Sequence, residues 1–191
     1  MSAFEVPQGR LKSPFYNRLS AVDTVNAWHS WAGYSCPDEL YCSETEYFAI
    51  RNTTGVFDIT PMTKYRITGP DALDYLHRLV TRDMAKVAPG RVAYAVWCDD
   101  QGQVIDDGTI FHLREGDYRL CSQERHMAWF KAAAIGFDVS IVDETEAVAA
   151  LAVQGPTTWS ILNNMGLAGL EELKLFGLAF FDFEGLSLIH I

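Results

Sequence analysis

The chain has 191 residues, 49% of them hydrophobic and 13% aromatic, a composition that supports packed cores and excludes a disordered protein. Its 25 acidic and 15 basic residues give a formal net charge of -10, which repels phosphate backbones and argues against nucleic acid as a partner. No apolar run approaches the ~20 residues of a membrane span, and the charged, proline-containing start differs from a signal peptide. We therefore expect a cytoplasmic protein without a membrane partner.

The first third of the chain is expected to contain an irregular arm and then a helix. Residues 1–35 carry scattered aromatic anchors without a clear period. The next segment, "CSETEYFAIRNTTG", has the signals of a helix, because Ser43 can cap the first turn, acidic residues favour its positive end, and Gly55 offers a stop. The segments "VFDIT" and "TKYRIT" follow as strands that are separated by a proline.

A strand that ends in Gly-Pro and leads into an apolar-periodic helix occurs twice. The two segments are "YRITGPDALDYLHRLVT" and "LAVQGPTTWSILNNMG", with the glycines at Gly69 and Gly155. Proline suits a first helical position, because its φ is preset and its missing N–H would have no helical acceptor. A duplicated strand-helix unit and two independent turns both explain this pattern.

The middle of the chain predicts an antiparallel meander. Three strand-like runs, "RVAYAVWCD", "QVIDDGTIFHL" and "DYRLCS", are separated by short turns, and "ERHMAWFKAAAI" then predicts a helix before the strand "FDVSIVD". Near the end, "LAFFDFEGLSLIHI" predicts two strands around Glu184 and Gly185, and the chain stops at Ile191 in mid-strand, as expected of a truncated chain. The predicted fold class is α+β, with mostly antiparallel sheets and flanking helices.

The stretch "CDDQGQVIDDGTIFH" contains two pairs of aspartates with different contexts. Asp99 and Asp100 are explained as turn formers. Asp106 and Asp107 follow a strand residue, and side chains in a strand alternate between faces, so one should face solvent and the other the interior or a cleft. A carboxylate in a cleft can exchange protons near neutral pH, but it can also simply bind neighbouring backbone groups. Both interpretations stay open on the pattern alone.

Aromatic residues on the adjacent predicted strands also allow two interpretations. Tyr94, Trp97, Phe111 and Tyr118 could line a pocket for a flat heteroaromatic ligand, or they could form the ordinary aromatic core of a sheet. Neither a GxGxxG nor a Walker phosphate loop occurs.

Histidines and cysteines show no pattern typical of a catalytic or metal site. The five histidines are scattered singly, so we interpret them as surface or core residues. The four cysteines form no CxxC pair and have no histidine at ligand spacing, which predicts reduced thiols and no metal site. They are Cys36, Cys42, Cys98 and Cys121.

Three ordered segments resemble a known family. "RNTTGVFDITPMTKYRITGPDALDYLHRLVTRD", "PGRVAYAVWCDDQGQVIDDGTIF" and "ALAVQGPTTWSIL" are similar, in order and spacing across about residues 28–191, to folate-dependent aminomethyltransferases, which include the T-protein of the glycine cleavage system and related tetrahydrofolate-dependent demethylases. The resemblance implies tetrahydrofolate as cofactor and transfer of an aminomethyl or methyl group. It also implies a one-carbon donor that is either a small molecule or a lipoyl-carrying protein.

The resemblance also assigns site residues. It implies that Asp107, the second aspartate of the family's DD step, is the catalytic carboxylate, while Asp106 supports the strand. The residues implied to bind the cofactor are Met62, Tyr94, Asp107, Thr109 and Phe111.

Two segments depart from the pattern of the T-proteins. Where those proteins read "FDVSHMG", this chain reads "FDITPMT", so Pro61 replaces a histidine. Where they read "VNA", with an asparagine that approaches folate, this chain reads Leu120, Cys121 and Ser122. We therefore expect a relative that uses a different one-carbon donor.

The family's architecture implies how the chain is organised. Residues 1–65 and 146–191 would form an incomplete, discontinuous first module, and residues 66–145 an inserted α+β module that carries the aspartate pair. Family members continue well beyond Ile191, so we expect the N-terminal portion of such a protein. The alternatives are a noncatalytic folate-binding module of the iron-sulfur-maintenance type and an inactive fragment.

Overall fold

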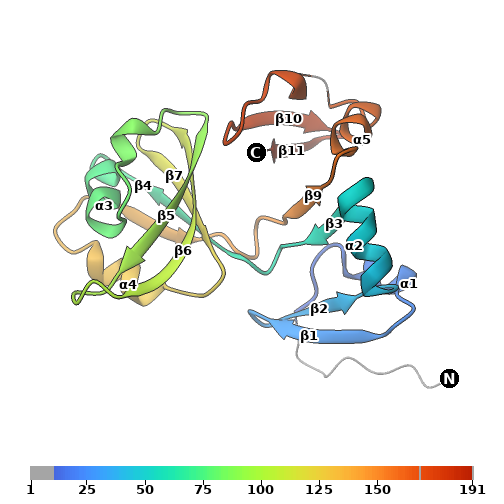
Figure 1. Cartoon of the computed structure of the whole chain (residues 1–191). Helices are drawn as coiled ribbons and strands as arrows, with labels where there is room; N and C mark the ends of the chain where they lie inside the picture. The colour runs from blue at the N-terminus through green and yellow to red at the C-terminus, as the bar shows by residue number, and fades with distance from the viewer. Residues whose placement is uncertain (1–10, 168, 191) are drawn as a thin grey trace. The chain divides into compact units, whose positions relative to one another are not determined.

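The computed structural model describes residues 11–167 and 169–190, and for residues 188–190 it describes the backbone alone. The chain divides into two compact units (Figure 1). The first comprises the described parts of Met1–Pro61 and Val148–Met165, and the second those of Met62–Ala147 and Gly166–Ile191.

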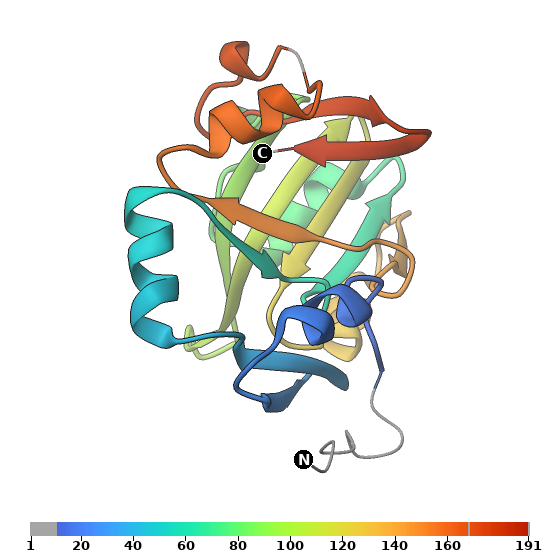
Figure 2. The ribbon, with the colours of Figure 1, turned by 90° about the vertical axis from the view of Figure 1, so that its right-hand side faces the viewer.

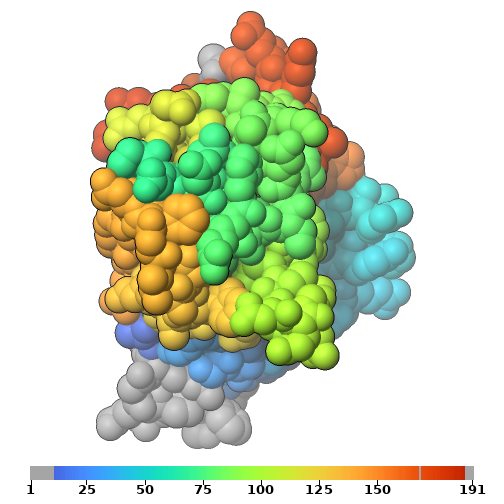
Figure 3. All heavy atoms as spheres, turned by 90° about the vertical axis from the view of Figure 1, so that its left-hand side faces the viewer, coloured from blue at the N-terminus to red at the C-terminus, as the bar shows by residue number. Residues whose placement is uncertain are grey.

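The second unit is built on a five-stranded antiparallel sheet with the strand order β5-β6-β7-β4-β8. The strands are β4 (Thr63–Thr68), β5 (Arg91–Cys98), β6 (Val104–Arg114), β7 (Asp117–Ser122) and β8 (Ser140–Asp143). Helices α3 (Ala72–Leu79) and α4 (Met127–Ala133) cover one face of this sheet, and the 3-10 helix η1 (Met84–Lys86) follows α3 (Figures 1 and 3). The predicted α+β class with mostly antiparallel sheets is confirmed.

The core of the second unit lies between the helices and this face of the sheet. Helix α3 buries Ala72, Tyr75, Leu76 and Leu79, the spacing of one face of a helix. Alternate residues of the strands point at this helical layer, as Trp97 does with no exposed surface. The side chains between them point to the opposite face of the sheet, hereafter the open face, on which Tyr94 and Asp107 are exposed whereas Arg119 and Cys121 are buried.

Residues 169–190 contain the 3-10 helix η2 (Leu170–Glu172) and the predicted hairpin, β10 (Ala179–Phe183) and β11 (Leu186–His190). Glu184 and Gly185 at its turn have φ values of 50° and 79°, as a tight hairpin turn requires. Ile191, where we expect the interrupted strand, lies outside the described residues. The segment before the hairpin runs along the start of β5, where Val92 N–H donates to the Phe176 carbonyl at 2.9 Å.

The first unit contains α1 (Tyr16–Val22), the hairpin of β1 (Ala27–Trp31) and β2 (Tyr34–Glu39), and α2 (Ser43–Asn52). Strand β3 (Gly55–Asp58) then pairs with β9 (Leu151–Gln154), which leads into α5 (Thr158–Asn164).

Three expectations about the first unit were wrong. Residues 1–35 were expected to be irregular, but the described part forms α1, β1 and the start of β2, because Ala32 and Gly33 both adopt positive φ and close a hairpin. Helix α2 begins at Ser43, whose hydroxyl donates to the Glu39 carboxylate instead of capping the first turn. Gly55 starts β3, and the helix ends earlier, at Asn52.

The predicted modules, 1–65 with 146–191 and 66–145, describe the family's full-length architecture and stay a prediction. The units of this structure divide near the same positions, but residues 166–191 are grouped with the middle of the chain. The contacts between β5 and the segment that precedes β10 account for this grouping.

No helix in the described parts of the chain is both long and apolar enough to cross a membrane.

Candidate functional site

The open face of the sheet in the second unit gathers four of the five predicted cofactor-binding residues. Figure 2 shows the sheet from the side away from α3, which lies behind the strands. Tyr94 of β5 lies directly opposite Thr109 of β6, while Asp107 and Phe111 flank Thr109 two residues away on the same strand. Since side chains two apart in a strand share a face, these four side chains form one surface.

Asp107 and Tyr94 are hydrogen-bonded to each other on this face. The bond to the Asp107 carboxylate raises the pKa of the Tyr94 phenol above its ordinary value, because deprotonation would remove the donor and place two negative charges together. The phenol therefore stays protonated at neutral pH and donates to the carboxylate. Both residues are exposed, so the carboxylate is reachable by a ligand bound on this face.

Asp106 points to the other face of the sheet. Its Oδ2 lies 2.7 Å from His126 Nε2, and its Oδ1 accepts the Asp107 backbone N–H at 2.8 Å. The Asp106 and His126 side chains are only 16% and 15% exposed. The prediction that the two aspartates face different sides is confirmed, and the inward carboxylate is the one with compensating partners.

His126 was interpreted from the sequence as an ordinary surface or core residue, and its pairing with Asp106 was missed. His126 precedes α4, whereas Asp106 belongs to β6, and β7 lies between them in the chain. A pair of side chains that meets only when β7 and α4 fold back leaves no spacing signal in the sequence. The carboxylate inside a predicted strand was the one available hint that a donor would be nearby.

Gly108, directly after the aspartates, was also missed. A Cβ atom on this residue would lie 2.2 Å from the Cys121 carbonyl oxygen of β7, a distance that no side chain tolerates. Glycine therefore permits the close approach of β6 to β7 beside Asp107.

The aromatic residues are divided between the two faces. Tyr94 and Phe111 belong to the open face, whereas Trp97 and Tyr118 are buried in the core with 0% and 1% exposure. Trp97 packs edge-on against Phe130 of α4, with ring centroids 5.5 Å apart. The core interpretation is therefore correct for Trp97 and Tyr118, whereas a ligand pocket at Tyr94 and Phe111 stays a prediction.

Ion pairs cross the open face on β7 and β4. Arg119 of β7 binds Glu144 at 2.9 Å through both its Nε and its NH2 group. Arg66 of β4 forms a bidentate pair with Asp117, and its NH1 lies 3.9 Å from Glu144. These contacts hold both guanidinium groups along the sheet and offset the charge of the two carboxylates.

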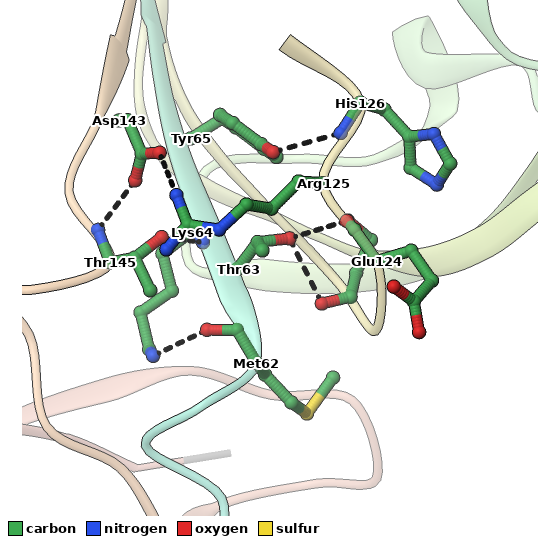
Figure 4. A network of polar contacts seen from close by, with 10 residues as sticks. Met62, Thr63, Lys64, Tyr65, Glu124, Arg125, His126, Asp143 and Thr145 are labelled. Atoms are coloured by element: carbon green, nitrogen blue, oxygen red, sulfur yellow. Dashed lines mark hydrogen bonds and ion pairs between the residues drawn. The ribbon is translucent and has the colours of Figure 1, made fainter. Parts of the chain in front are cut away.

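Met62, the fifth predicted cofactor-binding residue, belongs to neither β5 nor β6. It precedes β4, which is separated from β6 by β7. Its carbonyl oxygen accepts a hydrogen bond from Lys64 Nζ at 2.7 Å (Figure 4). Because Thr63 and Gly108 both lie opposite Ser122 of β7, Met62 is level with Asp107 along the sheet, one strand away.

Of the three residues that replace "VNA", Cys121 is the one on the open face. It lies opposite Thr109 in the register of β6 and β7. Desolvation by burial raises the pKa of its thiol to about 11, so the residue is a neutral thiol at physiological pH. Ser122 points the other way, and its hydroxyl is hydrogen-bonded to Thr63 at 2.8 Å.

Within the described residues, no three His, Cys, Asp or Glu side chains are grouped so that they could bind a metal ion. The open face therefore presents a carboxylate, a phenol, a hydroxyl and two aromatic rings, while the Cys121 thiol is buried in it. Such a surface can pack a flat ring and accept a proton from it.

Comparisons with known proteins identify the family of the chain. The family model described as "GCVT N-terminal domain" matches residues 18–190. The chain is 34% identical over 161 residues to the aminomethyltransferase of Bacillus subtilis (strain 168), covering 82% of this chain and 44% of that protein. It is 36% identical over 157 residues to the aminomethyltransferase of Alcanivorax borkumensis, covering 78% and 43%.

A solved structure has the same fold. The crystal structure of glycine cleavage system aminomethyltransferase T from Bartonella henselae matches with a TM-score of 0.77 and 22% identity, covering 88% of this chain and 46% of that one. The chain spans less than half the length of the curated relatives it matches. Because the family model covers most of the sequence, the chain belongs to the GCVT N-terminal domain family.

Proposed function

We propose that this chain is the N-terminal part of a tetrahydrofolate-dependent one-carbon transferase in which Asp107 is the catalytic carboxylate. One observation carries the proposal: Tyr94, Asp107, Thr109 and Phe111 share one open sheet face, and Tyr94 donates to the Asp107 carboxylate. The named aminomethyltransferases among the relatives support the reaction class.

The residues of this face suit a tetrahydrofolate. Bound tetrahydrofolate supplies a nucleophilic amine and a flat, heteroaromatic pterin ring. The rings of Tyr94 and Phe111 offer apolar surface for that ring, and the Thr109 hydroxyl offers one donor and one acceptor at its edge. Met62 is part of the proposal as a more distant contact, since it precedes a strand that is not adjacent to β6.

Asp107 takes the proton in the proposed reaction. A new carbon–nitrogen bond forms as the one-carbon unit leaves its donor, and the amine must lose a proton as that bond forms. The Asp107 carboxylate orients the amine and accepts this proton, a contribution of ~100- to 10,000-fold for a positioned base. The Tyr94 phenol holds the carboxylate on the open face through its hydrogen bond.

The donor is proposed to be a small molecule or a lipoyl-carrying protein, and the transferred group an aminomethyl or methyl unit. The relatives named aminomethyltransferase support the aminomethyl group. Pro61 and Cys121, which replace a histidine and an asparagine of the T-protein pattern, support a donor other than that of the T-proteins. The same comparisons do not favour the noncatalytic module of the iron-sulfur-maintenance type. We place the reaction in the cytoplasm, on the composition and the free thiols.

The test uses a full-length protein that contains this chain. Mass spectrometry of folate products after incubation with a panel of one-carbon donors identifies the donor and the transferred group. Asp107→Asn should lower turnover ~100-fold or more while the melting temperature stays unchanged. Asp100→Asn, in the exposed turn, is the matched control and should keep full activity.

Unchanged transfer by a folded Asp107→Asn protein would remove Asp107 from the mechanism. The chain by itself offers a second test, because a ligand that binds the folded state raises the melting temperature. If tetrahydrofolate neither raises the melting temperature nor is protected from oxidation by the chain, the inactive-fragment alternative gains support.

A further inference from the structure

We propose that His126 is a positioning residue that fixes Asp107 through the carboxylate of Asp106. The catalytic consequence of this arrangement rests on the proposed function, whereas the arrangement itself is a property of the fold. The three residues come from the N-terminal end of α4 and from β6.

Asp106 links His126 to the backbone of Asp107. A carboxylate only accepts hydrogen bonds, so His126 Nε2 carries the hydrogen that points to Asp106 Oδ2 across 2.7 Å. The other oxygen, Oδ1, accepts the Asp107 N–H at 2.8 Å. A carboxylate held at both oxygens does not rotate freely, and its second bond fixes the residue from which the Asp107 side chain extends. Such charge-assisted bonds are also the stronger kind.

His126 is itself held by the core. Its backbone N–H donates to the Tyr65 hydroxyl at 3.0 Å, and Tyr65 is fully buried (Figure 4). Its ring lies edge-on to the buried Trp97, with centroids 5.5 Å apart and planes at 79°. The position of the imidazole is therefore set by two buried side chains on the helical side of the sheet.

The loop that leads to His126 is fixed in the same way. The Thr63 hydroxyl, which has no exposed surface, is bonded to the Glu124 carbonyl at 2.9 Å and to the Ser122 hydroxyl at 2.8 Å. Figure 4 shows these bonds joining the start of β4 to the loop that ends at His126. Segments from β4, β7 and α4 thus converge behind the aspartate pair.

Asp107 is fixed from its other side as well. Gly108 brings β6 so close to β7 that a Cβ atom would meet the Cys121 carbonyl at 2.2 Å. The register of β5 and β6 shifts just beyond Asp106, between Trp97 and Cys98, before Cys98 pairs with Val104. The Asp106–His126 pair therefore lies next to a local irregularity of the sheet.

Precise placement of Asp107 matters to the proposed chemistry, because a misplacement of ~1 Å can lower a rate ~100-fold. The Tyr94 phenol orients the carboxylate end of Asp107, and the Asp106–His126 pair orients its backbone end. His126 touches neither the open face nor a ligand on it.

The test compares two substitutions of His126 in the full-length protein. His126→Leu keeps the volume and removes the donor, whereas the side-chain amide of His126→Gln can still donate to Asp106. We expect His126→Leu to lower kcat by ~10-fold or more without a matching rise in the KM for tetrahydrofolate, and His126→Gln to restore most of the loss. His77→Leu, at an exposed position of α3, is the matched control and should have no effect on kcat.

A spectroscopic readout on the chain itself separates positioning from general stability. The Asp107 amide proton should move upfield in His126→Leu, because Asp106 loses its orientation and the hydrogen bond to that amide weakens. In His126→Gln the chemical shift of the Asp107 amide proton should return to its wild-type value. The amide shifts of α3 should stay unchanged in both variants. If His126→Leu does not fold, Asp106→Asn is the second variant. It keeps the shape of the side chain and weakens both hydrogen bonds of Asp106, so it should also lower kcat.

Wild-type kcat in a folded His126→Leu or Asp106→Asn protein overturns the positioning role, provided that Asp107→Asn abolishes turnover. An unmoved Asp107 amide in His126→Leu also overturns it. If Asp107→Asn keeps its activity, the proposed function fails instead, and the amide shift still decides whether His126 positions Asp107.

Discussion

The two Gly-Pro turns, one in each unit, have the same local geometry in different surroundings. Gly69 and Gly155 both have a φ of 140°. A Cβ atom on Gly69 would lie 2.3 Å from the Asp138 carbonyl oxygen, and one on Gly155 would lie 2.3 Å from that of Thr53. No other residue type fits either position, because the backbone conformation and the neighbouring carbonyl both exclude a side chain.

The match extends beyond the turns. In the second unit, α4 leads into β8, which pairs antiparallel with β4, the strand before Gly69. In the first unit, α2 leads into β3, which pairs antiparallel with β9, the strand before Gly155. This shared arrangement of two helices and two strands favours a duplicated unit over two independent turns.

The difference lies in what the following helices pack against. Helix α3 buries four residues against the five-stranded sheet, whereas α5 buries Leu162 alone. The turn geometry is therefore set locally by Gly and Pro, while the burial of the helix depends on the sheet that it meets. Substitutions at equivalent positions should separate these two contributions.

The largest expected effect comes from the glycines. Gly69→Ala should lower the free energy of unfolding by ~3 kcal/mol or more, since it adds both backbone strain and a clash with a carbonyl. Gly155→Ala meets the same clash, but the helix that follows Gly155 buries a smaller face. The loss of unfolding free energy should therefore be concentrated in the first unit. Urea unfolding, followed by hydrogen exchange in each unit, measures the two losses.

Gly102→Ala is the control for strain without a clash, because Gly102 has a φ of 78° and open space around its Cα. It should cost only about 1 kcal/mol. If Gly69→Ala and Gly102→Ala lower the free energy of unfolding equally, the carbonyl next to Gly69 contributes nothing to the loss.

The next effect concerns the helices themselves. Leu76→Ala in α3 removes a side chain with no exposed surface and should cost about 3 to 4 kcal/mol, while Leu162→Ala in α5 should cost about 2 kcal/mol. Thermal and urea unfolding of both variants would test this order. A larger loss for Leu162→Ala would contradict the contrast between the helices.

The smallest effect on stability, and the clearest chemical contrast, concerns two thiols. Backbone N–H groups of Thr45 and Glu44 lower the pKa of the exposed Cys42 in the first unit, whereas burial raises that of Cys121 in the second to about 11. Since the thiolate is the reactive form, iodoacetamide at neutral pH should alkylate Cys42 first. Mass spectrometry of the peptides gives the two rates, and Cys42→Ser is the control. Faster labelling of Cys121 in the folded chain would reverse the expected order.

Two turns of the chain were predicted from their residue types, and a third was missed. Asp99 accepts the N–H groups of Gln101 and Gln103 at 2.9 Å each, as its type predicts for a turn. The hairpin at Glu184 and Gly185 was predicted on the same basis. The hairpin of β1 and β2 was missed, because Ala32 is an uncommon residue at positive φ and gives no signal.

The sequence by itself determined the antiparallel meander, both Gly-Pro turns and the opposite orientation of the two aspartates, because each depends on alternation or turn chemistry over a few residues. The tertiary structure decided that the inward aspartate meets His126 and that Gly108 lies against β7. These contacts join residues from different strands and helices, and only the folding of β7 and α4 against β6 brings the residues together.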